Sequence, residues 1–280
     1  KLKVSNFVNA AITANTAKTS NATHSGEVTG ATALTIADGV VDEANLKVSN
    51  APTNGYVLTA QSGNTGGMTW AEAASTGVDT QLTATSNIGL GANAVNSITT
   101  GDYNVGLGDE ALTATTTGTK NNAFGYSALE LNTTGNFNVA VGHKTLEANT
   151  TASYNTGLGY FSLTANTTGA NNVAVGFRAL ATNTTASNNT AVGYDSLYAN
   201  TTGASNTAVG HAALDANTTA NDNAAFGYHA LSGNTTGASN TGIGHLALYA
   251  NTTASNNTAV GKSALTANTT GAHNSALGYQ

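Results

Sequence analysis

The stretch Asn189-Thr-Ala-Val-Gly193-Tyr-Asp-Ser-Leu197-Tyr-Ala-Asn200-Thr-Thr-Gly203-Ala-Ser205 is one copy of a 17-residue repeat that occupies most of the chain. Gly193 belongs to a column of twelve glycines that recur every 17 residues without a slip. An asparagine stands four residues before each of these glycines, and ten successive leucines stand four residues after them. A fixed short period of this kind indicates that one structural unit is stacked many times.

The composition of the repeat favours a coil of strand and turns over a pair of helices. Common helical repeats need roughly 33 residues or more, and strong helix formers are few beside Gly, Asn and Thr. The five residues that end at the glycine are expected to form a strand, with Val173 and Val175 on one face and a small residue on the other. A second extended piece should carry the leucine, and Asn-Thr-Thr-Gly should turn, because Asn and Gly tolerate a left-handed backbone.

We therefore predict that residues 86–280 form an all-β parallel β-solenoid (β-roll) of 17-residue coils, rising about 4.8 Å per coil. Its asparagines are expected to stack in a hydrogen-bonded ladder, and the glycines to mark a positive-φ corner or a close backbone approach. The leucine and the apolar residue before the glycine should fill the core. The predicted ladders include Asn138, Asn155, Asn172, Asn189, Asn206, Gly142, Gly159, Gly176, Gly193, Gly210, Leu146, Leu163, Leu180, Leu197 and Leu214.

Each coil offers only two sizeable apolar side chains, and the chain has no cysteine that could staple the fold. Such a thin core predicts that several copies associate along the long axis, burying one more face per coil. We expect a parallel homotrimer, for which the resemblance described next gives further reason.

Segments such as Asn138–His143 (Asn-Val-Ala-Val-Gly-His) resemble the head repeats of trimeric autotransporter adhesins. In that family similar units coil into a left-handed parallel β-roll, with three chains side by side. The complete repeat, with its Asn-Thr-Thr-Gly, resembles more closely the repeats of bacteriophage tail fibres, and 46–70 is similar to a segment common in those fibres. The resemblance implies a trimeric tail-fibre shaft, located on the virion or extracellular, that can touch host cell-surface polysaccharide. Other fibre or baseplate proteins would join it through parts outside this sequence. A bacterial surface adhesin or extracellular filament subunit with the same roll is the alternative.

Composition and motifs argue against other classes of function. The net charge is −6 and only 8% of residues are charged, so no basic patch suggests nucleic acid. The chain has no apolar run of 18 residues, so its sequence gives no sign of membrane insertion. Carboxylates do not pair at repeating positions, serines and histidines lack a nucleophile context, and histidines lack convergent partners for a metal. We expect no enzymatic activity, no catalytic or metal-binding residues and no cofactor.

Residues 1–73 are predicted to be a separate β-rich fibre segment, with 74–85 as a linker into the solenoid. Two strands, 56–61 and 68–73, joined by a Gly-rich loop at 62–67, give a hairpin signal. Turns are expected in 36–45 and 49–55, and Trp70 is expected to anchor a core or a subunit contact. The opening 1–6 nearly recurs at 45–50, so we expect an excerpt of a longer shaft. The first two coils lack Asn-Thr-Thr, as expected of capping repeats.

Two exposed columns suggest binding, and each has a structural alternative. The residue after each glycine is usually aromatic or histidine, and these rings could stack on sugars or instead pack between coils or chains. The possible glycan-contacting ladder is Tyr126, Tyr160, Phe177, Tyr194, Tyr228 and Tyr279, with His143, His211 and His245 in the same column.

Asn-Thr-Thr recurs nine times and matches the glycosylation acceptor motif, although turn chemistry explains it as well. Its paired threonine rows leave ice binding as a remote alternative. Against that alternative, adjacent threonines in an extended strand would face opposite ways.

Overall fold

The computed structural model describes residues 56–60, 68–72 and 86–279. The chain divides into two compact units, Lys1–Ala73 and Ala74–Gln280. In the first unit, β1 (Tyr56–Ala60) pairs antiparallel with β2 (Met68–Glu72), with Leu58 opposite Trp70. This pair is the predicted hairpin. The turns expected in 36–45 and 49–55, the loop at 62–67, the linker at 74–85 and the side-chain role of Trp70 lie outside the described residues.

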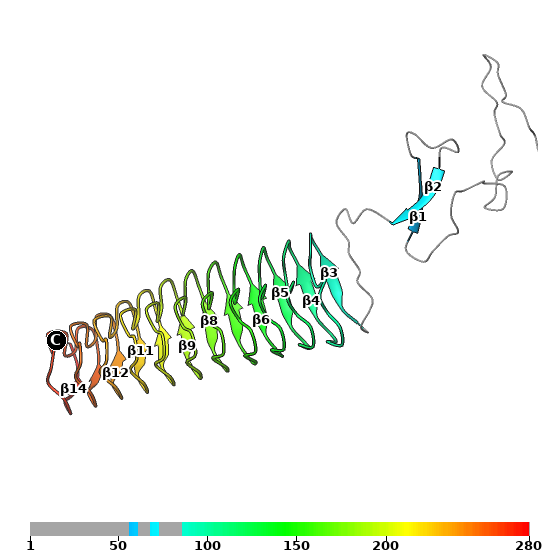
Figure 1. Cartoon of the computed structure of the whole chain (residues 1–280). Coiled ribbons are helices and arrows are strands. Elements are labelled where there is room, and N and C mark those ends of the chain that lie inside the picture. The colour runs from blue at the N-terminus through cyan, green and yellow to red at the C-terminus, as the bar shows by residue number, and fades with distance from the viewer. Residues whose placement is uncertain (1–55, 61–67, 73–85, 280) are drawn as a thin grey trace, which may run out of the picture. The chain divides into compact units, whose positions relative to one another are not determined.

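In the second unit, the predicted parallel β-solenoid is confirmed. Twelve strands form one parallel sheet in chain order, and no helix occurs among the residues that the structure describes (Figure 1). The strands are β3 (Ile88–Leu90), β4 (Val105–Leu107), β5 (Asn122–Phe124), β6 (Val139–Val141), β7 (Thr156–Leu158), β8 (Val173–Val175), β9 (Thr190–Val192), β10 (Thr207–Val209), β11 (Ala224–Phe226), β12 (Thr241–Ile243), β13 (Thr258–Val260) and β14 (Ser275–Leu277).

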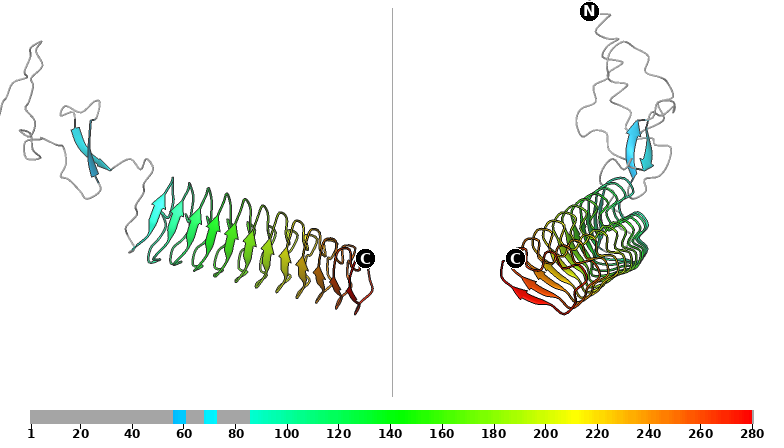
Figure 2. Two further views of the ribbon diagram at one scale, coloured as in Figure 1. Left: turned by 180° about the vertical axis from the view of Figure 1, so that it is seen from behind. Right: turned by 90° about the vertical axis from the view of Figure 1, so that its left-hand side faces the viewer.

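Each strand pairs with its copy one repeat away. In β9 and β10, Thr190 lies opposite Thr207 and Val192 lies opposite Val209, and the other neighbours keep the same 17-residue register. One repeat is therefore one coil, and the strands stack along one side of the solenoid, as both views of Figure 2 show.

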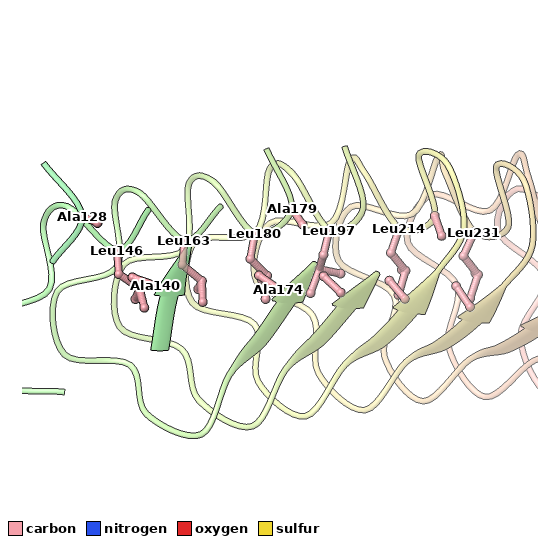
Figure 3. Close-up of a cluster of buried hydrophobic side chains, with 14 of the residues drawn as sticks. Ala128, Ala140, Leu146, Leu163, Ala174, Ala179, Leu180, Leu197, Leu214 and Leu231 are labelled. Carbon is pink, nitrogen blue, oxygen red and sulfur yellow. The ribbon is translucent and has the colours of Figure 1, made fainter. Parts of the chain in front are cut away.

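The interior of each coil is narrow. The middle residue of the strand, such as Ala191, and the leucine, such as Leu197, are fully buried, together with the small residue before the leucine, such as Ser196. Figure 3 shows the leucines in single file along the interior, with alanines beside them. A continuous hydrophobic core therefore runs the length of the solenoid, one leucine thick.

The prediction that the residue before the glycine also fills this core was wrong. The strand side chains alternate, so in a three-residue strand only the middle one points inward. Val141 and Leu158 are 38% and 37% exposed, and they point outward with the residues at the other end of their strands. The apolar face that a coil buries is thus smaller than the sequence suggests.

The backbone path after the glycine also differs from the expectation. The leucine does not lie in a second strand but has a left-handed backbone, with φ +54° at Leu197. The same conformation occurs two residues after the glycine (Asp195, φ +53°) and before the next asparagine (Ser205, φ +60°). Each such residue costs roughly 1–2 kcal/mol. Asn200 and Gly203 do not adopt it, so left-handed tolerance does not explain the Asn-Thr-Thr-Gly segment.

The glycine column marks both a positive-φ corner and a close backbone approach, the two explanations that the sequence left open. Gly193 has φ +136°, a backbone conformation open almost only to glycine. A Cβ atom built there would also lie within 2.4 Å of the carbonyl oxygen of Gly210 in the next coil. The corner is therefore both conformationally special and in direct backbone contact with its neighbour.

Candidate functional site

The 17-residue period places the first asparagine of each coil in a buried ladder. The backbone N–H of Asn189 donates to Oδ1 of Asn172, and Asn189 Oδ1 accepts from the backbone N–H of Asn206, each at 2.9 Å. Asn189 Nδ2 donates to the carbonyl of Gly203 at 2.9 Å. The predicted ladder residues Asn138, Asn155, Asn172 and Asn206 make the same bonds to their own neighbours. Every hydrogen-bonding atom of these side chains is used inside the solenoid, so none is free for a substrate.

The asparagine of Asn-Thr-Thr forms a second buried ladder, which none of the interpretations of this triplet predicted. Asn200 Nδ2 donates to Asn183 Oδ1 and to the carbonyl of Gly203, both at 2.9 Å. The Gly203 carbonyl thus accepts from both asparagines of its coil. From Asn132 to Asn251 all these side chains are buried, so a glycosyltransferase cannot reach the acceptor nitrogens in the folded solenoid. A turn alone does not require the same three residues in every coil, so the unvarying Asn-Thr-Thr triplet was the sequence signal that could have indicated this second ladder.

The two threonine rows of Asn-Thr-Thr have different environments. Thr201 Oγ1 and its amide both donate to the carbonyl of Thr218, at 3.0 and 2.9 Å, and the amide of Thr202 reaches the same oxygen. The row that contains Thr202 is exposed in every coil, and its hydroxyls make no bond within the solenoid. The row that contains Thr201 is partly buried except near the C-terminal end, at Thr252 and Thr269. One exposed row is not the flat two-dimensional array that ordering of water would require.

The aromatic column forms a continuous stack. Consecutive rings lie with centroids 4.8–5.6 Å apart and planes within 25° of one another. The stack consists of Tyr126, His143, Tyr160, Phe177, Tyr194, His211, Tyr228 and His245, whereas Tyr279 lies beyond it near Lys262. Each inner ring has both faces covered by its neighbours. The predicted glycan contact would therefore have to use ring edges and tyrosine hydroxyls, not the ring faces on which sugars stack.

Two basic residues beside the stack, Lys144 and Arg178, are paired with carboxylates. Arg178 binds Asp195 of the next coil through two hydrogen bonds, at 2.8 Å from Nε and 2.5 Å from Nη2, and its guanidinium lies 4.6 Å from the Tyr198 ring. Lys144 Nζ donates to Glu147 Oε1 at 2.6 Å. These carboxylate hydrogen bonds raise the pKa of Arg178 and of Lys144 above their ordinary values. The pairs stabilise neighbouring turns and are only partly buried.

One polar trio has the residue types of a hydrolase site. Ser232 Oγ donates to Asp215 Oδ1 at 2.6 Å and lies 3.2 Å from His229 Nδ1. The Ser232 hydroxyl directs its proton to the carboxylate and not to the imidazole, so His229 is not placed as a base for that hydroxyl. The trio connects neighbouring coils. Within residues 86–279 and the hairpin strands, no group of three or more acidic or histidine side chains could hold a metal ion. The same described residues contain no helix able to cross a membrane.

The strand side of the solenoid carries an uncharged outer surface, which includes the residue before each glycine that was predicted to lie in the core. We call it the apolar band and define it by two columns. The ridge is the residue before each glycine: Leu90, Leu107, Phe124, Val141, Leu158, Val175, Val192, Val209, Phe226, Ile243, Val260 and Leu277. The flank is the first residue of each strand: Ile88, Val105, Asn122, Val139, Thr156, Val173, Thr190, Thr207, Ala224, Thr241, Thr258 and Ser275. Neither column contains a charge, and the ring stack runs beside the ridge around the glycine corner.

Successive coils are not equivalent, because a two-coil alternation overlies the 17-residue period. From Gly135 onward, the residue after Asn-Thr-Thr is alternately Gly and Ala. Each of these alanines, from Ala152 to Ala254, is followed by Ser or Asn. The amide of Ala170 donates to Ser187 Oγ at 3.0 Å, and that of Ala204 donates to Asn221 Oδ1 at 2.7 Å. The polar side chain of one coil type therefore serves the backbone of the other. Reading alternate repeats separately would have shown this pattern.

Comparisons of the chain with protein-family models, with curated proteins and with solved structures give no match. The class that the structure itself defines is a repeat protein with a parallel β-solenoid fold.

Proposed function

We propose that the chain is a structural fibre protein, the shaft of a bacteriophage tail fibre, and that its solenoid is a rod within that shaft. The observation that carries the proposal is the unbroken stack of coils, with twelve strands in one register, in which two asparagine ladders hydrogen-bond from coil to coil along the axis. At about 4.8 Å per coil this rod is roughly 50–60 Å long. The resemblance of the repeat to tail-fibre repeats supports the same function.

The working unit that we propose is a parallel homotrimer outside the cell. A core one leucine thick is thin for an isolated rod, and the apolar band gives each chain a face that association would cover. Contact with host cell-surface polysaccharide is part of the proposal, through ring edges and hydroxyls of the aromatic column rather than through stacking.

The mass and shape of the full chain test this proposal. Light scattering should give about three times the 27.7 kDa formula mass, and electron microscopy should show thin rods. A folded monomer would refute the trimeric shaft. Gold-labelled antibodies against the solenoid should bind phage tails, whereas labelling confined to the envelope of uninfected bacteria would replace the fibre with a surface adhesin.

A further inference from the structure

We propose that the apolar band is the seam between copies of this chain, which lie parallel and in the same register, with Asn122 fixing that register. The inference rests on the proposed function in requiring several copies, but it assigns a surface and an alignment that the function alone does not specify.

The length and the chemistry of the band fit an interface between proteins. The exposed members of its ridge include Phe124 at 37%, Phe226 at 40% and Ile243 at 40%. The ridge is apolar in every coil, the flank beside it carries no charge, and together they run along the whole solenoid, roughly 50–60 Å. A contiguous exposed apolar surface of this kind marks an interaction site and is expected to be covered.

The period of the band identifies the partner as a second copy. The ridge repeats the same chemistry at every coil, about 4.8 Å apart, along the whole rod. A partner that touches every level must have the same rise per repeat, and another copy of this chain has it by construction. A globular partner would cover a few levels and leave the remainder of the ridge in water.

The flank indicates the direction and the register of the copies. Its isoleucine and its three valines all lie in the first six coils, from Ile88 to Val173, whereas the last six coils carry threonine, serine and one alanine. Parallel copies place like against like, and antiparallel copies would place isoleucine and valine against threonine and serine.

Asn122 is the one amide in the flank, it is half-buried, and its side chain makes no hydrogen bond within the solenoid. In parallel, unslipped copies, Asn122 side chains meet at one level and can bond to each other, as a single polar residue does in a coiled-coil seam. A slip of one coil would place the amide beside Val105 or Val139 instead.

The ring stack lies at the edge of this seam. Its ring faces are closed by neighbouring rings, while Tyr160 and Tyr194 remain 45% and 47% exposed at their edges. The stack therefore borders the seam without being part of it, and its exposed edges and hydroxyls remain available for the proposed polysaccharide contact.

Single cysteines test the alignment cleanly, because the natural chain has none. Val192→Cys and Val260→Cys, each in the full chain, should both cross-link to their own copies on oxidation or with a short bis-maleimide. The expected product is a covalent dimer within the assembly. Thr202→Cys, on the exposed threonine row, is the matched control and should stay uncross-linked. Antiparallel copies could self-link at only one of the two ridge positions, because only one level can coincide with itself.

The register element is tested by adding Asn122→Val to Val192→Cys. Since the Asn122 side chain makes no hydrogen bond within the solenoid, the melting temperature of the coil should change little. Slipped alignments should then lower the yield of the Val192→Cys cross-link at least two-fold, and Asn122→Gln should restore part of it. An unchanged yield would remove Asn122 as the register determinant.

The two proposals fail in different ways. A trimeric mass with cross-links at Thr202→Cys, and none at either ridge position, overturns the seam while the fibre proposal stands. A folded monomer in light scattering removes the fibre shaft itself. A trimer that links at both ridge positions supports the seam.

Discussion

Replacing Asn189 by alanine should destabilise the solenoid more than replacing Asn200, although both are fully buried asparagines of one coil. Asn189→Ala removes the only acceptor of the Asn206 backbone N–H, and the fixed backbone does not allow this N–H to reach another acceptor. Asn200→Ala removes the donor to Asn183 Oδ1 and the acceptor of Asn217 Nδ2, but both of these groups are on side chains that can rotate, and Asn217 Nδ2 keeps its bond to the Ala220 carbonyl. The Gly203 carbonyl keeps one amide donor in either variant.

The magnitudes follow from these bonds. Each lost hydrogen bond costs about 1 kcal/mol net, and a buried group left without a partner adds about 1–3 kcal/mol. Asn189→Ala loses two bonds and leaves a rigid buried N–H without a partner, so it should lower the free energy of unfolding by about 3–5 kcal/mol. Asn200→Ala loses three bonds but leaves no rigid group unpaired, so it should cost about 3 kcal/mol. Orphaned buried N–H groups are rarer in proteins than under-satisfied oxygens, which is the reason for the order.

Denaturant unfolding gives the two costs, and hydrogen exchange with mass spectrometry locates them. Peptides that include Asn206 should exchange faster in Asn189→Ala and at the native rate in Asn200→Ala. Thr202→Ala, which removes only an exposed hydroxyl, is the control and should change neither quantity. Native protection at Asn206 in the Asn189 variant would show that the ladder bond does not hold that amide, and the reasoning would fail.

Four further predictions concern other columns. Leu197→Asp should lower the melting temperature sharply, because it puts an unpaired carboxylate at a fully buried core position. An unchanged melting temperature would show that the leucine column is exposed to solvent. Gly193→Ala should cost about 3 kcal/mol or more of unfolding free energy through its φ and its backbone clash, and a neutral result in a denaturant titration would contradict that geometry. Ser205→Gly, at an exposed residue with φ +60°, should be neutral or stabilising by up to about 1 kcal/mol; a clear loss would show that the left-handed backbone is not strained. The pair of Lys144 and Glu147 raises the lysine pKa in the folded state, so its small stabilisation is complete below pH 10.5 and is lost at higher pH. A thermal-melt difference from Lys144→Met that persisted unchanged well above that pH would exclude the ion pair as its source.

The sequence predicted the solenoid because the period appears in every column at once. A 17-residue recurrence of Asn, Gly and Leu leaves one coil per repeat as the simplest stack, and the strand pairing has that register. The hairpin could be predicted for a local reason, since alternating apolar residues flank a Gly-rich loop.

The sequence could not predict the direction in which the ridge points. Alternation assigns Val192 and Ala191 to opposite faces, but it does not say which face is inside. Hydrophobicity favoured the valine, yet the interior has room only for the alanine beside Leu197. Left-handed backbone at Leu197 was equally hidden, because propensity gives leucine no reason to adopt it and only the burial of its side chain compensates the strain. The candidate surface therefore emerged from the structure.

The alternation of coil types constrains how a rod of this kind can change length during evolution. Deleting the single coil 172–188 would bring Ala170 beside Ala204 and remove the Ser187 acceptor from its amide. Deleting the pair of coils 172–205 would bring Ala170 beside Asn221, which already accepts from such an amide in the present chain. Recombination between repeats is thus expected to add or remove coils in twos. Related genes should differ by multiples of 34 codons, and the rods they encode by steps of about 10 Å.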